Sequence, residues 1–355
     1  CHRGFYHRGL HVGCHSHPSP IALVDAISTS CNGYFCWGLY YMMGNRRKYH
    51  SVQDAMTTWR DYMVSMGFGY KLGIDLPGEK RGMIPNAEYY DRNYRGSWNG
   101  LTIISISIGQ GEVTLTPLQI ANLGATIANR GYYYAPHVVR KVSGEPLDTA
   151  YTRRHVTKAS RRSYDYVVAG MRSSALKGTC KHLAHYDFEA CGKTGTAQNR
   201  GHDHSVFMGF APMNNPKIAI CVYVENGGWG ADYGVPIGGL MMEQYLHGKL
   251  SPASEAQAAE MQKRRIGYGQ RYANQPVKGK KGSKAAAKAA ADSAAAAKKA
   301  AALAAAKQKA ELKAKQQADL KAKQKGKKGA KDKNNEAQRG KGIVPITIEN
   351  HQGRR

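Results

Sequence analysis

The sequence predicts an α+β fold in which an antiparallel sheet packs with helices. Three strand-like segments follow one another closely at residues 190–198, 205–211 and 217–225, with short turns between them, which favours an antiparallel meander. Helix-like segments precede this group, and another follows it at residues 236–247. Helices, then a meander, then a closing helix are typical of α+β layers around one core.

The helices before the sheet are predicted from apolar spacing and from residues that begin or end helices. Thr116 can cap a helix and Pro117 suits its first position, and Gly67 follows a segment with helical spacing. The predicted helices cover residues 20–28, 34–43, 51–66, 116–129 and 160–176. Residues 73–82 are predicted to form a loop. Residues 101–108 alternate apolar and small polar side chains and are predicted to form a strand or a buried extended segment.

Charge divides the chain of 355 residues into two parts. Residues 1–250 hold 26 Lys and Arg against 17 Asp and Glu, a net of +9, whereas residues 251–355 hold 26 against 8, a net of +18. The second part is rich in Lys and Ala and has few large apolar residues, so it cannot bury a core of its own. We therefore expect a folded domain over residues 1–250 and a low-complexity basic tail over residues 251–355 that is disordered or a solitary helix.

Neither the cysteines nor the apolar segments indicate a disulfide-stabilised small protein or a membrane span. The seven cysteines are odd in number and unevenly spaced, which is not the pattern of a compact disulfide framework. No run of about 18 apolar residues and no signal-peptide pattern occurs in the sequence. Because the first residue is not Met, we expect the natural N-terminus to lie upstream.

Two short motifs carry residues suited to acyl transfer. The first is Ser30-Cys31-Asn32, between two predicted helices, and the second is Lys193-Thr194-Gly195-Thr196, at the first predicted strand. A hydroxyl such as that of Ser30 can relay a proton, and the Asn32 amide can both donate to and accept from a substrate amide. Serine enzymes that act on β-lactams and D-alanyl peptides carry Ser-x-x-Lys, Ser-x-Asn and Lys-Thr-Gly in this order, and the last two are present.

The second motif predicts a site for a peptide carboxylate. Lys193 supplies a positive field there, and the hydroxyls of Thr194 and Thr196 can bond the same carboxylate. Gly195 has no side chain where a peptide would lie along the strand. We expect the backbone N–H of Thr196 to be an oxyanion donor, and Gln198 to be either a substrate contact or a polar residue at the strand end.

Four segments extend these motifs: SCNGYF, GIDLPGE, SIGQGEVTLTPLQIA and CGKTGTAQN. Together they resemble the transpeptidase domain of class B penicillin-binding proteins, and among these the elongation-type, penicillin-binding protein 2-like branch. The resemblance covers residues 1–250 and implies the penicillin-recognising fold that serine β-lactamases share. It implies catalytic roles for Ser30, Asn32, Lys193 and Thr196 and substrate contacts for Thr194, Gly195 and Gln198. For Asp75 and Gln110, in two of the segments, we expect structural roles in shaping loops.

One element of the family pattern is missing ahead of Ser30. The serines that precede it, Ser16, Ser19 and Ser28, are not followed by lysine three residues later. The family places its Ser-x-x-Lys nucleophile segment upstream of the Ser-x-Asn motif. The resemblance therefore implies that this segment, the first strands of the sheet and a membrane anchor lie before Cys1, and we expect the chain as given to be inactive.

A group of cysteines and a histidine lies near the first motif. Cys1, Cys14, His17 and Cys31 fall within the first 31 residues, and three thiolates with one imidazole form the ligand set of a closed, structural zinc site. Two other interpretations remain, namely a Cys1–Cys14 disulfide or thiols that only fill space in the core. Acyl transfer by a serine requires no cofactor.

The resemblance implies a peptidoglycan D,D-transpeptidase that cross-links stem peptides through an acyl-serine intermediate during wall elongation and is acylated by β-lactams. The implied location is the periplasmic face of the inner membrane, with a membrane glycan polymerase of the elongation machinery as partner. A β-lactamase or β-lactam sensor would share the fold. Hydrolysis by a class A β-lactamase needs a glutamate a few tens of residues after the Ser-x-Asn motif, whereas the first glutamates after Asn32 are Glu79, in the GIDLPGE segment, and Glu88.

An alternative of another class is a basic protein that binds nucleic acid or another anionic polymer through its tail. The tail lacks the interleaved aromatic residues of a nucleic-acid reader, with Tyr268 and Tyr272 near its start. The resemblance implies that the tail lies outside the cytoplasmic membrane, where we expect its partner to be anionic lipid or wall polymer.

Overall fold

The computed structural model describes residues 1, 3–199 and 201–266, which fall within one compact unit, Cys1–Gln275. The predicted α+β fold with an antiparallel sheet is confirmed. Strands β5 (Cys191–Ala197), β6 (His204–Ala211) and β7 (Ile218–Val224) form a sheet in the order β5-β6-β7. Each pairs with the next in antiparallel register, so the sheet is the predicted meander.

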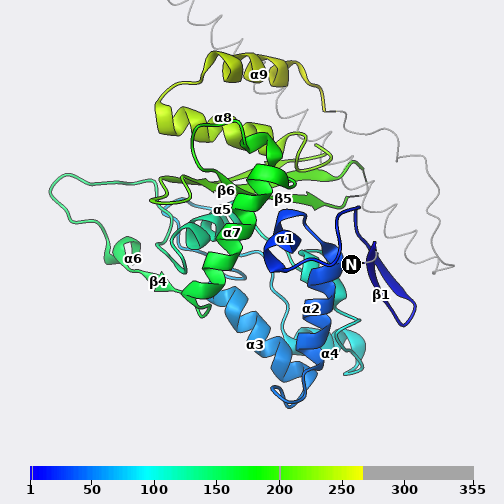
Figure 1. The fold of residues 1–355 in the computed structure, drawn as a ribbon. Coiled ribbons are helices and arrows are strands. Elements are labelled where there is room, and N and C mark those ends of the chain that lie inside the picture. The colour runs from blue at the N-terminus through cyan, green and yellow to red at the C-terminus, as the bar shows by residue number, and fades with distance from the viewer. Residues whose placement is uncertain (2, 200, 267–355) are drawn as a thin grey trace, which may run out of the picture. The chain divides into compact units, whose positions relative to one another are not determined.

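Helices cover both faces of this sheet (Figure 1). Helix α8 (Gly234–His247) packs on one face, and helices α5 (Pro117–Ala128) and α7 (Arg161–Lys177) pack on the other. Successive side chains of β6 point to opposite faces of the sheet, so neighbouring residues contact different helices. The Phe207 ring lies so close to Gly238 of α8 that a side chain there would collide with it, whereas Met208 on the other face approaches Gly124 of α5.

A second group of helices lies beyond the α5 and α7 face, around its own apolar cluster. Its elements are α2 (Asn32–Gly44), α3 (Val52–Ser65), α4 (Ala87–Tyr94), the 3-10 helix η1 (Ile104–Ile108) and the hairpin of β1 (Gly4–His7) and β2 (Leu10–Gly13). The cluster includes Phe5 and Tyr90, both fully buried. The Tyr90 hydroxyl donates to Glu112 across 3.0 Å, which satisfies its one polar atom.

Shorter elements connect these groups. They are α1 (Leu23–Ser28), β3 (Tyr132–Tyr133), α6 (Thr149–Thr152), β4 (His155–Val156) and the 3-10 helix η2 (Lys181–Leu183). Helix α9 (Pro252–Lys263) follows α8. Strands β3 and β4 form a separate two-stranded ribbon.

Ser51, Thr116 and Ser160 begin helices as predicted, whereas the helix predicted from residue 20 begins at Leu23. Ser51 caps α3 by accepting the N–H of Asp54 across 3.1 Å. Thr116 and Gln119 form a reciprocal capping box at the start of α5, with Pro117 in the first helical position. These local signals act within one turn of chain, which is why the sequence reveals them.

The prediction of a strand or extended segment at residues 101–108 is wrong. Residues 104–108 form the 3-10 helix η1, although their alternation of Ile and Ser matches a strand. Ile103 and Ile106, three positions apart, are both buried, and this is the repeat of a 3-10 turn. Ser107 also donates to the carbonyl of Ile104 across 2.6 Å, a local bond that competes with strand pairing.

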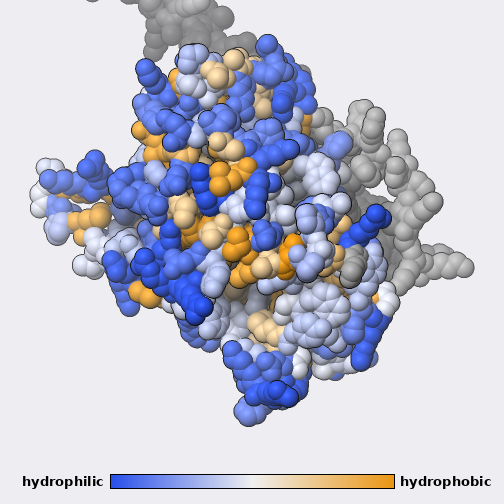
Figure 2. Space-filling view, viewed as in Figure 1, coloured by the Kyte–Doolittle hydropathy of each residue, from blue (hydrophilic) through white to orange (hydrophobic). Residues whose placement is uncertain are grey.

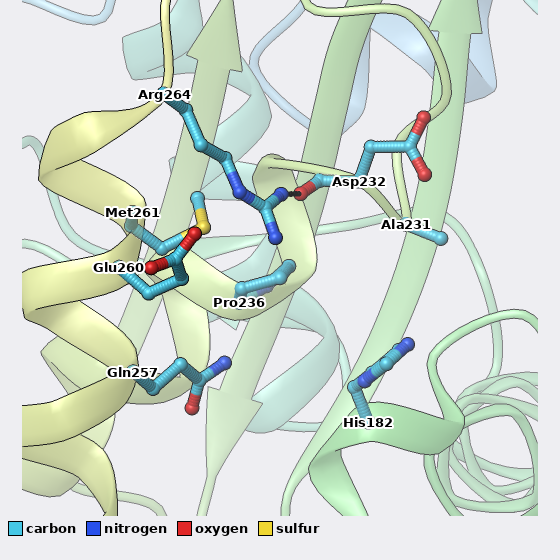
Figure 3. A pocket seen from close by; sticks show the side chains of 8 residues that line it. All are labelled: His182, Ala231, Asp232, Pro236, Gln257, Glu260, Met261 and Arg264. Carbon is cyan, nitrogen blue, oxygen red and sulfur yellow. Dashed lines mark hydrogen bonds between the residues drawn. The ribbon is translucent and has the colours of Figure 1, made fainter.

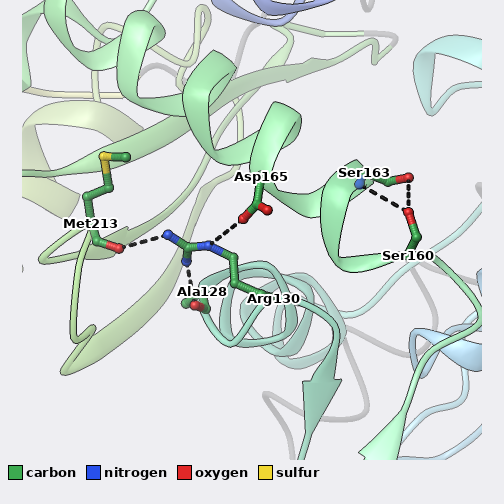
Figure 4. A network of polar contacts seen from close by, with 6 residues as sticks. All are labelled: Ala128, Arg130, Ser160, Ser163, Asp165 and Met213. Carbon is green, nitrogen blue, oxygen red and sulfur yellow. Dashed lines mark hydrogen bonds and ion pairs between the residues drawn. The ribbon is translucent and has the colours of Figure 1, made fainter.

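Arg130 links α5 and α7 to the turn between β6 and β7 (Figure 4). Its guanidinium donates to the carbonyls of Ala128, across 2.6 Å, and of Met213, across 3.1 Å, and lies 3.5 Å from the Asp165 carboxylate on α7. The Arg130 side chain is only 14% exposed, so these three partners compensate for much of the water that its charge loses.

The first residues of the predicted tail belong to the folded unit. Helix α9 packs beside α8, and its Ser254 is 1% exposed. The predicted division at residues 250 and 251 stays a prediction, and the predicted disorder or solitary helix from residue 267 onward lies outside the described residues.

The surface of the described part is mixed in character. Hydrophilic side chains cover most of the face in Figure 2, and hydrophobic ones reach the surface in patches near its middle. Among residues 1, 3–199 and 201–266, no helix is both long and apolar enough to cross a membrane.

Candidate active site

Ser30 lies at the break between α1 and α2, in an unusual backbone conformation. Its φ is +54°, in the left-handed region that residues other than glycine rarely adopt. Helix α1, which precedes it, is pressed against α7: a Cβ at Gly170 would lie 2.7 Å from the Cβ of Ile27. Ser173 on α7 also donates to the hydroxyl of Ser28 across 3.0 Å. These contacts fix the end of α1 and therefore the direction in which Ser30 points.

The structure brings Lys193 of β5 to Ser30. The Lys193 ammonium donates to Ser30 Oγ across 2.7 Å and to the carbonyl of Thr194 across 2.8 Å. Burial disfavours the charged form and lowers the pKa of Lys193 to about 8. The second and third motifs thus meet, and their shared ammonium is close to its titration range at neutral pH.

The side chain of Thr194 is held by a hydrogen bond to Thr179, which follows α7. Its hydroxyl donates to that of Thr179 across 2.8 Å, and Thr179 in turn lies 3.3 Å from the hydroxyl of Ser174 on α7. The N–H of Thr179 donates to the carbonyl of Ser28. This arrangement couples β5 to the end of α1, and the Thr194 hydroxyl is already engaged within the protein.

The last two residues of the Lys-Thr-Gly-Thr motif, Gly195 and Thr196, also lie on β5. Thr196 pairs with Ser205 of β6, and its carbonyl accepts from the Gln110 side chain across 3.1 Å. Gly195 pairs with Val206, and a Cβ there would lie 3.3 Å from the Cβ of that residue. Gln198 follows the last residue of β5 and is exposed.

Asn32 begins α2 and turns toward the N-terminal hairpin. Its side-chain amide donates to the carbonyl of Gly13 across 2.9 Å. The residue before it, Cys31, is fully buried and caps α2 by accepting the N–H of Tyr34. Asn32 is therefore linked to the loop that carries Cys14, one residue after Gly13.

The predicted metal ligands do come together. The ligand atoms of Cys1, Cys14, His17 and Cys31 all lie within 4.8 Å of one another. Cys14 Sγ lies 3.5 Å from His17 Nε2, and His17 Nδ1 lies 2.8 Å from the carbonyl of Pro18. A carbonyl at Nδ1 fixes the ring and leaves Nε2 as the free lone pair, as in histidines that bind metals. The donor set and its spacing fit a tetrahedral ion.

A Ser-x-x-Lys string does occur later, at residues 174–177, but its two side chains do not form a nucleophile pair. Ser174 is fully buried against Thr179. The Lys177 side chain is 72% exposed and lies 3.9 Å from Asp25. A general base must be within hydrogen-bond reach of the hydroxyl that it deprotonates.

Two residues contact the site beyond those predicted to form it. Gln110, for which we expected a role in shaping a loop, donates from its side-chain amide to the carbonyl of Thr196. Thr179 follows Gly178 after α7 and carried no motif, although its hydroxyl contacts Thr194. Asp75, in the GIDLPGE segment, does shape a loop, because its carboxylate accepts the N–H groups of Val138 and Val139.

Comparison with known proteins identifies the family of the chain. The family model for the penicillin binding protein transpeptidase domain matches residues 5–243. The chain therefore belongs to the penicillin-binding protein transpeptidase family.

Individual proteins and solved structures within this family are similar to the chain. The peptidoglycan D,D-transpeptidase MrdA of Acinetobacter baumannii is 36% identical over 227 residues, which are 58% of this chain and 32% of that protein. The structure of Pseudomonas aeruginosa PBP2 in complex with WCK 5153 matches with 32% identity and a TM-score of 0.56, over 66% of this chain and 50% of that one. A peptidoglycan synthase complex, described as coordinating polymerization and crosslinking, matches with 28% identity and a TM-score of 0.53, over 68% and 39%.

These relatives are longer than the matched region. The chain spans about a third of the length of the curated relatives that it matches. Their matched region is a penicillin-binding protein 2-like transpeptidase domain, and the chain shares its fold.

Proposed function

We propose that these residues form the C-terminal part of a peptidoglycan D,D-transpeptidase that cross-links stem peptides during wall elongation. The contact between Lys193 and Ser30 carries the proposal, because it joins the Ser-x-Asn and Lys-Thr-Gly motifs across 2.7 Å. The nucleophile is a serine of a Ser-x-x-Lys segment outside these 355 residues.

In acylation, that serine attacks the carbonyl of the penultimate D-alanine. The serine C–O bond forms, the amide C–N bond breaks, and the terminal D-alanine leaves with a proton on its amine. The Ser30 hydroxyl, which accepts a hydrogen bond from Lys193, relays this proton. The Lys193 ammonium attracts the substrate carboxylate, and the N–H of Thr196 stabilises the oxyanion.

In the second step, an amine of a neighbouring stem peptide attacks the acyl-serine. The new amide forms and the serine oxygen leaves, taking back a proton through the same hydroxyl relay. Thr194 and Gly195 hold the acyl peptide along β5, and Gln198 contacts it at the strand end. Asn32 orients the substrate amide, which requires its side chain to turn from Gly13.

Labelling with fluorescent penicillin tests the proposal. The chain as given should form no covalent adduct, and the same chain joined to a Ser-x-x-Lys segment should form a stable one. A stable adduct on the chain as given would refute the assignment of the nucleophile. Rapid loss of the adduct from the joined chain would favour the alternative of a β-lactamase.

We further propose that Cys1, Cys14, His17 and Cys31 hold a structural zinc ion. The support is the 4.8 Å grouping of their ligand atoms. The ion would supply no chemistry to acyl transfer, since a closed site of four protein ligands leaves no position for substrate. These residues instead brace the segment that presents Ser30 and Asn32, since Cys31 lies between these two residues.

The cellular setting follows from the relatives and is also a proposal. A peptidoglycan synthase complex among the matched structures supports a membrane glycan polymerase as partner. A relative described in complex with WCK 5153 supports small-molecule binding by this domain, and β-lactams are the inhibitors that we propose for it. We place the enzyme at the periplasmic face of the inner membrane, where its substrate is assembled.

A further inference from the structure

The loop between β7 and α8 packs directly against β5 at the catalytic motif. A Cβ at Gly230 would lie 2.6 Å from the carbonyl oxygens of both Gly195 and Val206, so the loop backbone touches the sheet there. The hydroxyl of Ser205 donates to the carbonyl of Trp229 across 2.8 Å. Ser205 lies on β6 and pairs with Thr196 of β5, so this bond joins the loop to β6 directly beside the proposed oxyanion donor.

The other side of the same loop is held by the end of α9 (Figure 3). Arg264 donates to the carbonyl of Asp232 across 3.0 Å, and its guanidinium lies 5.6 Å from the centre of the Tyr233 ring. A cavity of about 240 Å³ opens beside this contact, between α9 and the loop. The cavity leaves open space beside the loop, so the contacts from Arg264 support the loop where it faces α9.

Helix α9 is itself anchored, so it can act as a fixed support. The N–H of Ser251, the cap of α9, donates to Glu243 of α8 across 3.1 Å. Ser254 in the first turn is 1% exposed. Arg264 therefore extends from a helix whose start is bound to α8.

We propose that Arg264 is a positioning residue for the catalytic strand. It acts through residues 229–233 of the loop between β7 and α8, and so holds β5 where the Thr196 N–H can donate to the oxyanion. The catalytic part of this inference rests on the proposed function. Oxyanion donors work only within about 0.5 Å of their productive position. Loss of Arg264 should therefore slow the chemical step more than it weakens binding.

Hydrogen exchange on the chain as given tests the coupling without any catalysis. Arg264→Ala should speed amide exchange in residues 226–234 and 192–197 by about fivefold, because local opening becomes easier. Arg265→Ala is the matched control, since it removes the same charge from an exposed neighbour. Arg264→Lys should restore part of the protection. Equal exchange in the two alanine variants, with equal melting temperatures, would overturn the coupling.

Penicillin acylation tests the catalytic consequence in the chain joined to a Ser-x-x-Lys segment. Arg264→Ala should lower the maximal acylation rate constant about three- to tenfold with little change in half-saturating concentration. A chain ending at Gln275 should match the full chain, and one ending at Leu250 should be at least as slow as Arg264→Ala. Unchanged rates in both Arg264→Ala and the Leu250 chain would overturn the positioning role. If the parent is not acylated at all, the proposed function fails, while hydrogen exchange still decides the coupling.

Discussion

The ammonium of Lys193 donates a hydrogen bond to Ser30 Oγ across 2.7 Å, although 163 positions separate the two residues. Lys193 lies on a regular strand, whereas Ser30 occupies a left-handed backbone position between two helices. Strain of this kind persists only where the surroundings impose it. Here α7 supplies the constraint, by packing against α1 at Gly170.

The pH dependence of acylation should reveal the titration of the Lys193 ammonium. Its pKa is lowered to about 8, so the rate should fall as pH rises through that value and the positive field is lost. In Lys193→Ala this alkaline limb should disappear, and the rate at neutral pH should drop on the order of a hundredfold or more. The measurement is the acylation rate from pH 6 to 10 in the chain joined to a Ser-x-x-Lys segment. A change below about threefold would refute the role of Lys193.

The same pKa has a consequence for stability with a definite sign. Between pH of about 8 and 10.5, the unfolded chain binds a proton at Lys193 that the folded chain has lost. Stability should therefore rise with pH through this window, since the unfolded state holds more protons there. Denaturant unfolding of the chain as given, compared with Lys193→Met, measures the effect. Equal pH slopes in the two proteins would show that folding does not lower the pKa of Lys193.

Replacing Ser30 by Gly and by Ala should separate its two properties. Both changes remove the hydroxyl and should slow acylation by a similar factor, on the order of a hundredfold. Their stabilities should differ, because glycine adopts a φ of +54° without strain and alanine does not. We expect Ser30→Gly to be more stable than Ser30→Ala by about 1 kcal/mol. The comparison requires denaturant unfolding of both variants, and a more stable alanine variant would contradict the conformation assigned to Ser30.

Sequence patterns predicted the features that are determined by neighbouring residues or by short motifs. The sheet, the capped helices α3 and α5 and the two motifs followed from periodicity and from a few residues each. The 3-10 helix at residues 104–108 could not be predicted this way, since ISISI fits both a strand and a tight turn until the core position of Ile103 is known. The contact of Gln110 with Thr196 crosses 86 positions of sequence. Such pairings depend on tertiary packing, which no local pattern encodes.

Zinc content is measurable on the chain as given, because all four proposed ligands are present. We expect about one equivalent by elemental analysis of protein purified without chelator, and a melting temperature that falls by several degrees when zinc is removed. Cys14→Ser should lose the metal, whereas Cys221→Ser, on β7 and outside the cluster, should keep it. Less than about a tenth of an equivalent with intact thiols would contradict the site. A Cys1–Cys14 disulfide found by mass spectrometry would replace it.

The basic segment after the compact unit should bind anionic surfaces through its charge. Residues 276–355 hold 22 Lys and Arg against 6 Asp and Glu, a net of +16. Each cation near an anionic membrane contributes about 1 kcal/mol, so several acting together should give measurable binding.

This attraction should depend on salt and not on shape. The full chain should co-sediment with anionic vesicles and with isolated wall polymer at low salt, and the binding should fade between about 50 and 200 mM salt as counterions compete. A chain ending at Gln275 is the control, because it keeps α9 and the motifs but lacks the net +16. Neutral vesicles should bind neither protein. Binding that survives high salt, or that the shorter chain retains, would show that the segment recognises a specific partner or that the folded unit is the binding element.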